Sequence, residues 1–139
     1  MQIPSRLHWF LWASIALATV QLVSGTQVRE SVDLLASSGL NRELWINSLP
    51  DWWEFHRSGA WLVAAVHVMW AFPARKWGRP YNRLARWVLA LLAIQATTGI
   101  LFSYFAMPAW AQPIHLMAGM AVVVMDAAVI WFLKPALKS

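Results

Sequence analysis

Four long apolar runs constrain the fold of this chain more than any other feature. They cover about residues 7–25, 55–72, 84–106 and 114–133. Each is close to the ~20 residues that a helix needs to cross a hydrocarbon core of ~30 Å. A composition of 60% hydrophobic and 12% charged residues also excludes an ordinary soluble domain. The sequence therefore predicts an all-α membrane protein, a single four-transmembrane-helix bundle over residues 1–139.

The distribution of basic residues predicts the orientation of the bundle. Lys and Arg in short connections favour the cytoplasmic side of a membrane. Eight of them belong to one side of the predicted topology: Arg6, Arg75, Lys76, Arg79, Arg83, Arg86, Lys134 and Lys138. Arg29, Arg42 and Arg57 fall on the other side. Both termini are therefore expected in the cytoplasm. The net charge of +5 reflects topology, so membrane lipids and not nucleic acid are the expected surroundings.

The segment 26–54 is the predicted outer loop. Apolar residues at positions 28, 32, 35 and 36 have helical spacing, so the first helix is expected to continue past the membrane, with Gly39 as its stop. Trp45, Trp52 and Trp53 are typical of the membrane interface. The chain has no cysteine, which excludes disulfides, thiolate metal sites and cysteine nucleophiles.

The first and third apolar runs resemble one another. "LATVQLVSGTQV" and "LLAIQATTGILF" share a Gln, three intervening residues and a Gly, which gives Gln21 with Gly25 and Gln95 with Gly99. Each run is followed by a predicted helix that carries a histidine near its outer start. A pseudo-twofold repeat of helix pairs would aim these two histidines, His56 and His115, at one another at similar depth.

Two facing histidines in a helical bundle are the ligand set of a bis-histidine heme. Neutral imidazole is a common axial ligand of heme iron, and bundles build cofactor sites from facing side chains. Gly25 and Gly99 would let the macrocycle approach the backbone. The Gln-x3-Gly pattern is also typical of close helix packing without any cofactor, and the pattern alone does not decide between the two.

Several of these motifs resemble the heme A synthase family. They are "SGTQVRE" after an apolar helix, "HR" opening the second helix, Gln-x3-Gly in the third, and "MPAWAQPIHLMAG" entering the fourth. Members of that family usually contain two four-helix halves, and the resemblance covers nearly the whole chain as one half. It implies that His56 and His115 ligate heme. In the family one half holds heme b, and the other oxidises heme O to heme A for a terminal oxidase.

The chain also departs from the family pattern. Catalytic halves commonly carry a cysteine pair and a glutamate just ahead of the histidine, whereas here no cysteine exists and Glu54 lies two residues before His56. Glu54 is the only candidate catalytic residue. The resemblance leaves open whether the chain is an enzyme: it is a cofactor-type half that joins a second half, or a half-length synthase that forms a homo-oligomer. The expected location is the plasma membrane of a bacterium or archaeon.

Two further functions stay open at this point. One is a non-catalytic b-type heme subunit, for electron transfer or structure, in a respiratory or photosynthetic membrane complex. The other is a scaffold that binds no cofactor. Pigment extracted from the purified protein would separate them, since heme b alone, heme O with heme A, or no heme would each favour a different reading.

Arginines near the outer end are candidate partners of the heme propionates. Gln21, Gly25 and Arg29 share one helix face at i, i+4 and i+8. Arg29 and Arg57 are the available bidentate donors on that side. The alternative for both is a solvated salt bridge, with Glu30 or Glu54 as partner.

Two ionisable residues are expected deeper in the bundle. His67 follows His56 by eleven residues, and Asp126 follows His115 by the same number. Eleven residues make about three helical turns, so each should lie below its histidine on nearly the same face. We expect a buried His67–Asp126 pair, with a proton route or redox-linked charge compensation as alternatives. His8, at the inner boundary, is expected at the interface.

Overall fold

The computed structural model describes residues 5–133, with side chains described for residues 9–132. Its elements are helices throughout these residues, as predicted. They are α1 (Ser5–Ser37), the short 3-10 helix η1 (Arg42–Leu44), α2 (Trp45–Ser48), α3 (Trp52–Ala74), α4 (Tyr81–Tyr104) and α5 (Ala111–Leu133). His8 and Arg6 lie outside the described side chains, and Lys134 and Lys138 lie outside the described residues.

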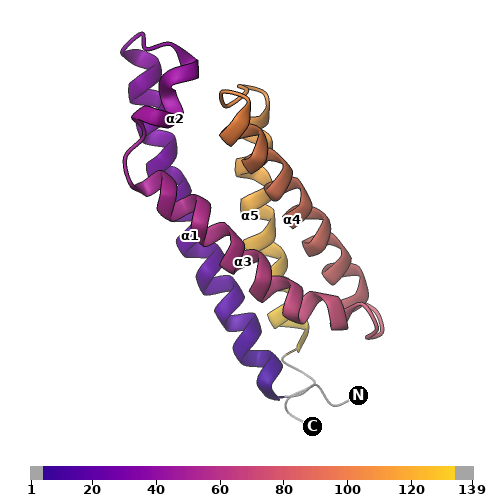
Figure 1. The fold of residues 1–139 in the computed structure, drawn as a ribbon. Coiled ribbons are helices and arrows are strands. Elements are labelled where there is room, and N and C mark those ends of the chain that lie inside the picture. The colour runs from indigo at the N-terminus through magenta and orange to yellow at the C-terminus, as the bar shows by residue number, and fades with distance from the viewer. Residues whose placement is uncertain (1–4, 134–139) are drawn as a thin grey trace.

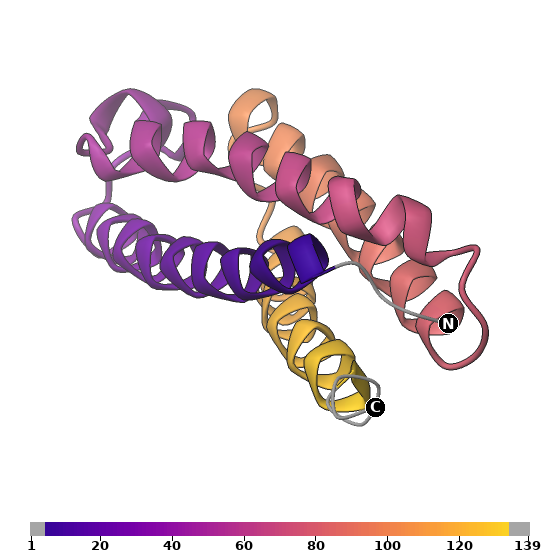
Figure 2. The same cartoon turned by 90° about the horizontal axis from the view of Figure 1, so that it is seen from below.

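The four long helices pack as two antiparallel pairs. α1 lies along α3, and α4 lies along α5 (Figure 1). Contacts between α1 and α5 and between α3 and α4 join the pairs side by side, as the view from below shows (Figure 2). The pairing follows the sequence repeat, because each Gln-x3-Gly helix packs on the histidine-bearing helix that comes after it.

Three of the long helices are apolar and long enough to cross a membrane: Trp9–Ser37, Tyr81–Tyr104 and Ala111–Phe132. The helix α3 is not among them, although its 23 residues are long enough. Its sequence includes four tryptophans, two histidines, Glu54 and Arg57, all of which lower the mean hydropathy by which such spans are recognised. A multi-pass membrane protein is therefore supported, and the predicted fourth span rests on the packing of α3 within the bundle.

Several predicted boundaries were wrong. In the segment 26–54, α1 continues to Ser37, as expected, but α3 begins at Trp52, three residues before the predicted start of its apolar run. The helix α1 ends where predicted from Gly39, whose φ of +77° suits glycine at a helix C-terminus. At the other outer turn, Ala106 leaves α4 with a φ of 52°, so the predicted helix 84–106 ends early.

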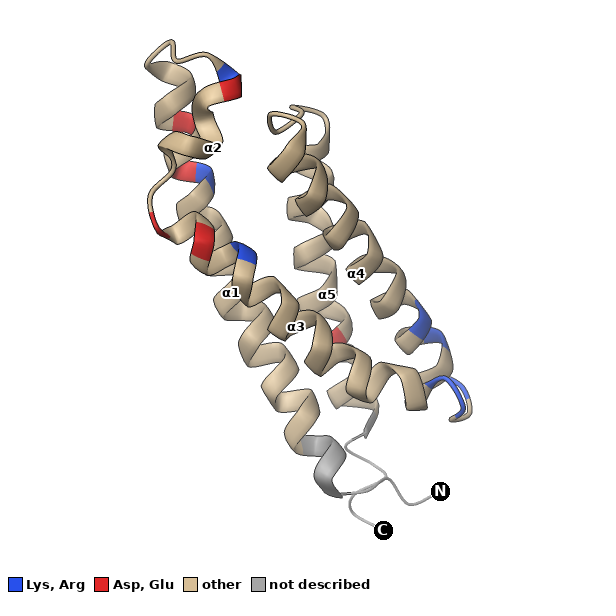
Figure 3. Cartoon of the chain, in the orientation of Figure 1, with Lys and Arg blue, Asp and Glu red and all other residues tan. Residues whose placement is uncertain are grey.

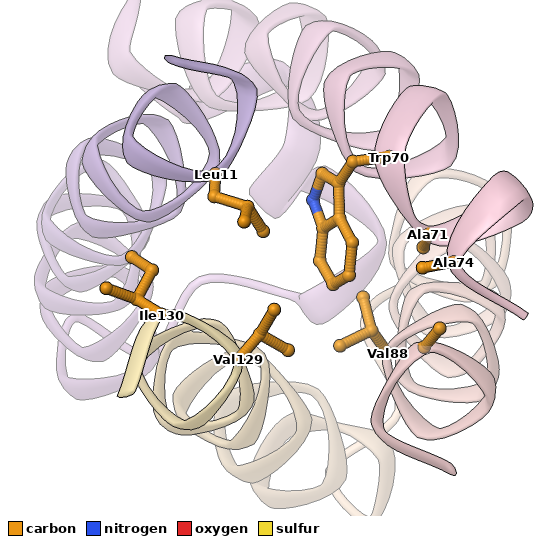
Figure 4. Close-up of a cluster of buried hydrophobic side chains, with 8 residues drawn as sticks. Leu11, Trp70, Ala71, Ala74, Val88, Val129 and Ile130 are labelled. Atoms are coloured by element: carbon orange, nitrogen blue, oxygen red, sulfur yellow. The ribbon is translucent and has the colours of Figure 1, made fainter. Parts of the chain in front are cut away.

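A buried hydrophobic cluster fills the inner half of the bundle. Its members come from all four long helices and are Leu11, Trp70, Ala71, Ala74, Ala85, Val88, Val129 and Ile130 (Figure 4). Trp70 is fully buried, and its indole Nε1 donates to Ser14 Oγ at 2.9 Å. This hydrogen bond joins α3 to α1 inside the cluster and satisfies the one polar atom of the indole.

A second cluster closes the outer end. It contains Val28, Val32, Trp45, Trp53 and Met107. The guanidinium of Arg42 donates to the Met107 carbonyl at 2.7 Å and so ties η1 to the turn between α4 and α5. Trp45 and Trp53, which were expected at the membrane interface, are 5% and 6% exposed because they pack in this cluster. Trp52 is exposed, as expected for an interfacial residue.

Charged residues separate to opposite ends of the bundle (Figure 3). The basic residues of the α3–α4 connection and of early α4 lie at one end, and the described acidic residues other than Asp126 lie toward the other. The separation agrees with the predicted topology. The side of the membrane on which each end lies remains a prediction.

Candidate functional site

The structure brings His56 and His115 together between the two helix pairs. Their ring centres are 6.3 Å apart, and the ring planes meet at 67°. Each histidine is the fifth residue of its helix, α3 or α5, and each is half-buried. The equal register of the two helices therefore places the imidazoles in one layer, about one turn inside the outer end.

A hydroxyl group contacts each imidazole from the neighbouring helix. Ser24 Oγ lies 2.9 Å from Nδ1 of His56, and Thr98 Oγ1 lies 2.7 Å from Nδ1 of His115. Both hydroxyl-bearing residues are 4% exposed. Nε2 of each histidine has no hydrogen-bond partner among the side chains described. The site is therefore a pair of imidazoles, each bound through Nδ1 to a hydroxyl of the neighbouring helix and each with a free Nε2.

The glutamines of the repeat contact the histidine backbone. Gln21 Nε2 donates to the carbonyl of His56 at 2.6 Å, and Gln95 Nε2 donates to that of His115 at 2.5 Å. Such bonds fix the height of one helix against the other. Gln21 and Gln95 therefore hold the histidine backbone, and their side chains reach it by crossing glycines on the opposite helix.

Those glycines have no room for a side chain. A Cβ atom at Gly59 would lie 2.9 Å from Gln21 Oε1, and one at Gly119 would lie 2.9 Å from Gln95 Nε2. Contacts under 3.0 Å require something to shift. Gly59 and Gly119 thus give each glutamine its path to the histidine carbonyl.

The glycines of α1 and α4 lie next to the Cε1 atoms of the imidazoles. A Cβ at Gly25 would be 3.0 Å from Cε1 of His56, whereas one at Gly99 would be 4.0 Å from Cε1 of His115. A side chain at Gly25 would therefore press against the His56 ring, whereas a Cβ at Gly99 would be at an ordinary van der Waals distance from His115. The aromatic ring of Phe102 adds a further contact on one side only, 5.0 Å from the ring of His115.

Sequence reasoning missed four residues of this site: Ser24, Thr98, Gly59 and Gly119. The first two were recognisable, because "QLVSG" and "QATTG" share a hydroxyl residue directly before the glycine as well as the Gln and Gly. The other two were not, because Gly59 follows its histidine by three residues and Gly119 by four, which conceals the correspondence.

Arg29 lies one turn outside the imidazole layer. Its guanidinium pairs with Asp33 at 2.7 Å and donates to Oε1 of Gln112 on α5, so it reaches from one helix pair to the other. Gln112 is three residues before His115. The ion pair with Asp33 replaces the expected alternative with Glu30. The contact with Gln112 therefore links α1 to α5 about one turn outside His115.

Arg57 and Glu54 pair with one another. The distance from Arg57 Nη2 to Glu54 Oε2 is 2.8 Å, and the two side chains are 51% and 59% exposed. This is the solvated salt bridge that the sequence offered as the alternative for Arg57. Nearby, the indole Nε1 of Trp53 is buried and has no acceptor. A buried unpaired donor one turn outside His56 is available to an anionic group.

His67 and Asp126 form a hydrogen-bonded pair in the inner half of the bundle. Nε2 of His67 is 2.9 Å from Oδ2 of Asp126, and both side chains are 0% exposed. The other ring nitrogen, Nδ1, donates to the carbonyl of Val63 at 2.7 Å. Oδ1 of Asp126 has no partner. The eleven-residue spacing thus corresponds to two residues that face each other across α3 and α5.

The ligand inventory of the described residues narrows what the site can hold. They contain no group of three or more His, Cys, Asp or Glu side chains that could hold a metal ion. Two imidazoles alone suit a metal whose other coordination positions are already filled, as a porphyrin fills them.

Comparison with known protein families matches residues 1–129 to COX15-CtaA, the cytochrome oxidase assembly proteins.

The chain belongs to this family. The heme A synthase resemblance seen in the sequence is thereby confirmed. No curated protein and no solved structure matches the chain. Membership in COX15-CtaA supports a part in cytochrome oxidase assembly and heme A synthesis, and it implies a heme-related cofactor.

Proposed function

We propose that this COX15-CtaA protein binds one b-type heme through His56 and His115 and takes part in the oxidation of heme O to heme A. The observation that carries the proposal is the pair of imidazoles 6.3 Å apart in the outer half of the bundle. When bound, the heme would supply a redox-active iron. The chain supplies two neutral nitrogen ligands, a fixed ligand spacing and a low-polarity surrounding.

The imidazole spacing suits an iron between the rings. Metal–imidazole bonds of about 2 Å on each side, with each ring centre about 1 Å behind its nitrogen, give about 6 Å between ring centres. The unpartnered Nε2 atoms agree with this use. Gly25 and Gly99, next to the Cε1 atoms of the rings, have no side chain that would fill this space, and we propose that they also border the macrocycle.

Two donors at the outer side of the layer would receive the propionates. Arg29 offers a guanidinium between the helix pairs, and Trp53 offers a buried N–H without an acceptor. Both arginines are in exposed ion pairs, but Arg29 also contacts the other helix pair through Gln112, so Arg57 is the weaker candidate. Charge-assisted hydrogen bonds from such donors both retain the cofactor and influence its potential.

The membrane arrangement that we propose has four spans and both termini in the cytoplasm. The helix α3 crosses with the other three because it packs along α1 and α4 over its length. The basic α3–α4 connection then lies in the cytoplasm. The imidazole layer lies toward the opposite face of the membrane.

We infer a cofactor-holding unit rather than a complete synthase. Glu54, the only candidate catalytic acid, is 59% exposed and paired with Arg57. Oxidation of heme O would then need a second half or another copy of this chain. The same observation favours the second candidate, a non-catalytic b-type heme subunit of a respiratory or photosynthetic complex.

The test is the absorption and EPR spectrum of the purified protein and its variants. The wild-type chain should carry heme b with a low-spin bis-histidine spectrum. His56→Ala and His115→Ala should each become high-spin or lose the heme, because each removes one axial ligand. The matched control is His67→Leu combined with Asp126→Leu: it removes a histidine of the same helix without leaving its buried partner unpaired, and the protein should stay low-spin.

Low-spin heme in both ligand variants would overturn the assignment. A wild-type protein without a Soret band would reject heme binding and leave the cofactor-free scaffold as the remaining function. Pigment analysis separates the remaining two functions, since heme O or heme A beside heme b indicates a synthase assembly, and heme b alone with a co-purifying oxidase or reductase indicates the subunit.

A further inference from the structure

We propose that Ser24 and Thr98 are positioning residues that select the tautomer of the two histidines, so that both Nε2 atoms are unprotonated before any cofactor arrives. The inference rests on the proposed function and deepens it. Neither residue belongs to the predicted ligand set, and both act on the imidazoles from the neighbouring helix.

Each of the two hydroxyls has a single proton, which it donates to a backbone carbonyl. Ser24 Oγ donates to the Gln21 carbonyl at 2.9 Å. Thr98 Oγ1 donates to the Ile94 carbonyl at 2.7 Å. A hydroxyl has one hydrogen and two lone pairs. Once that hydrogen points to a carbonyl, the oxygen can only accept from a third group.

The third group in each case is the imidazole Nδ1. Nδ1 of His56 and of His115 must then carry the proton and donate it to the hydroxyl oxygen. A neutral imidazole has one N–H, so Nε2 is left with a lone pair. The opposite tautomer would place an N–H at Nε2, for which the described residues provide no acceptor, and would break a hydroxyl-to-carbonyl bond. Hydrogen-bond satisfaction therefore selects the Nδ1–H form in both halves.

The identity of the acceptor has a chemical consequence. A metal-bound histidine commonly donates its other N–H to a carboxylate, carbonyl or water, which raises the basicity of the ligand. Here the acceptor is a neutral hydroxyl that already donates elsewhere. It fixes the ring without drawing the Nδ1 proton away, so both ligands stay neutral imidazoles. Loss of the hydroxyl should therefore affect tautomer and ring orientation more than ligand charge.

The first experiment uses the full chain without heme, produced in a heme-deficient host with ¹⁵N-labelled histidine. The ¹⁵N chemical shifts of the ring nitrogens distinguish the two tautomers directly. His56 and His115 should appear as Nδ1–H with a pyridine-like Nε2. In Ser24→Ala the signals of His56 should change to a tautomer mixture, while those of His115 stay, and Thr98→Val should do the reverse.

Thr97→Val is the matched control. Thr97 neighbours Thr98 and its hydroxyl also donates to a carbonyl one turn back, Ala93 at 2.8 Å, but it contacts no histidine. This variant should leave both histidine signals unchanged. Ser24→Thr, which keeps the hydroxyl, should retain the wild-type tautomer of His56.

The second experiment adds hemin to the same variants and follows the EPR g-values and the association rate. Ser24→Ala and Thr98→Val should bind more slowly and show a broader distribution of low-spin signals, because their rings are no longer fixed. Ser24→Thr should restore the narrow signal. A structural role alone would change stability and leave the g-value distribution as it is.

The results separate this inference from the proposed function. An Nε2–H tautomer in the wild-type apoprotein, or an unchanged tautomer in both hydroxyl variants, overturns the role of Ser24 and Thr98 even if heme binds. Tautomer selection without any heme binding would uphold that role and reject the heme assignment instead.

Discussion

At the scale of single residues, the two halves of the site contain the same kinds of residue but leave different amounts of space beside the imidazole. A hydroxyl, a glutamine and a glycine surround each histidine. The distance from an added Cβ to the imidazole is 3.0 Å at Gly25 and 4.0 Å at Gly99. The similarity comes from the repeat, and the difference predicts that one half of the site is more easily disturbed than the other.

Alanine substitution of the two glycines tests this difference. Gly25→Ala should displace the His56 ring, lower the heme-to-protein ratio several-fold and shift the low-spin EPR signal. Gly99→Ala should keep both near wild type, because 4.0 Å is ordinary van der Waals contact. Heme content by pyridine hemochromogen and the EPR spectrum measure both effects. Equal losses in the two variants would contradict the geometry.

Substitution of Glu54 tests the inferred lack of catalysis. Glu54→Gln should leave heme b content and cellular heme A unchanged, since an exposed ion pair contributes about 0–1 kcal/mol to stability. Heme A extracted from a strain that relies on the variant chain provides the measurement. A block in heme A formation with heme b retained would make Glu54 catalytic and this chain a synthase.

At the scale of elements, α3 and α5 are joined by one buried polar contact. The His67–Asp126 pair is the only described ion pair with both side chains fully buried. Since Nδ1 of His67 already donates to Val63, the hydrogen bond between Nε2 and Oδ2 requires one shared proton. The pair is therefore neutral as a unit, which suits a low-dielectric interior.

Breaking this pair should cost more than replacing it. Asp126→Ala should destabilise the bundle by about 1–3 kcal/mol, because it leaves a buried imidazole nitrogen without its hydrogen-bond partner. The double variant His67→Leu with Asp126→Leu should recover most of that loss, because apolar residues need no partner. Reversible unfolding in mixed detergent provides the free energies. A double variant as unstable as Asp126→Ala would indicate that the pair contributes more than mutual neutralisation.

The contact between α1 and α5 through Arg29 yields a second prediction at this scale. A cation next to the propionates stabilises the reduced heme and so raises its midpoint potential. Arg29→Ala removes this cation, so the variant should retain heme less well or have a lower midpoint potential. Asp33→Ala is the control, since it removes the ion pair and keeps the guanidinium. Spectroelectrochemical titration measures the potential. Equal behaviour of the two variants would assign Arg29 a purely structural ion pair.

At the scale of the whole molecule, the proposed topology can be tested with single cysteines, because the natural chain has none. Ser38→Cys, beyond α1, should react with a membrane-impermeant maleimide on intact cells. Gly78→Cys, in the α3–α4 connection, should react only after permeabilisation. Both sites are open: Ser38 is exposed, and no atom lies within 4 Å of a Cβ at Gly78. Labelling of both on intact cells would mean that α3 does not cross.

The sequence predicted most of the molecule through its two periodicities. Helix-length apolar runs predicted the long helices, and the Gln-x3-Gly repeat predicted their pairing and the meeting of His56 with His115. The start of α3 at Trp52 differs from the predicted start near residue 55, because the outer segment is stabilised by tertiary packing, which the length of an apolar run does not report. The glycines that admit Gln21 and Gln95 were missed because a close approach between helices leaves no periodic signal.

The inner hydrophobic cluster around Trp70 bears on whether the bundle can fold before its cofactor binds. His56 and His115 are not among the residues of this cluster, and all four long helices contribute to it. The bundle therefore has a core that is complete without the upper layer. Such a chain can be inserted and folded first and loaded afterwards, so that its supply in the membrane is independent of the supply of pigment.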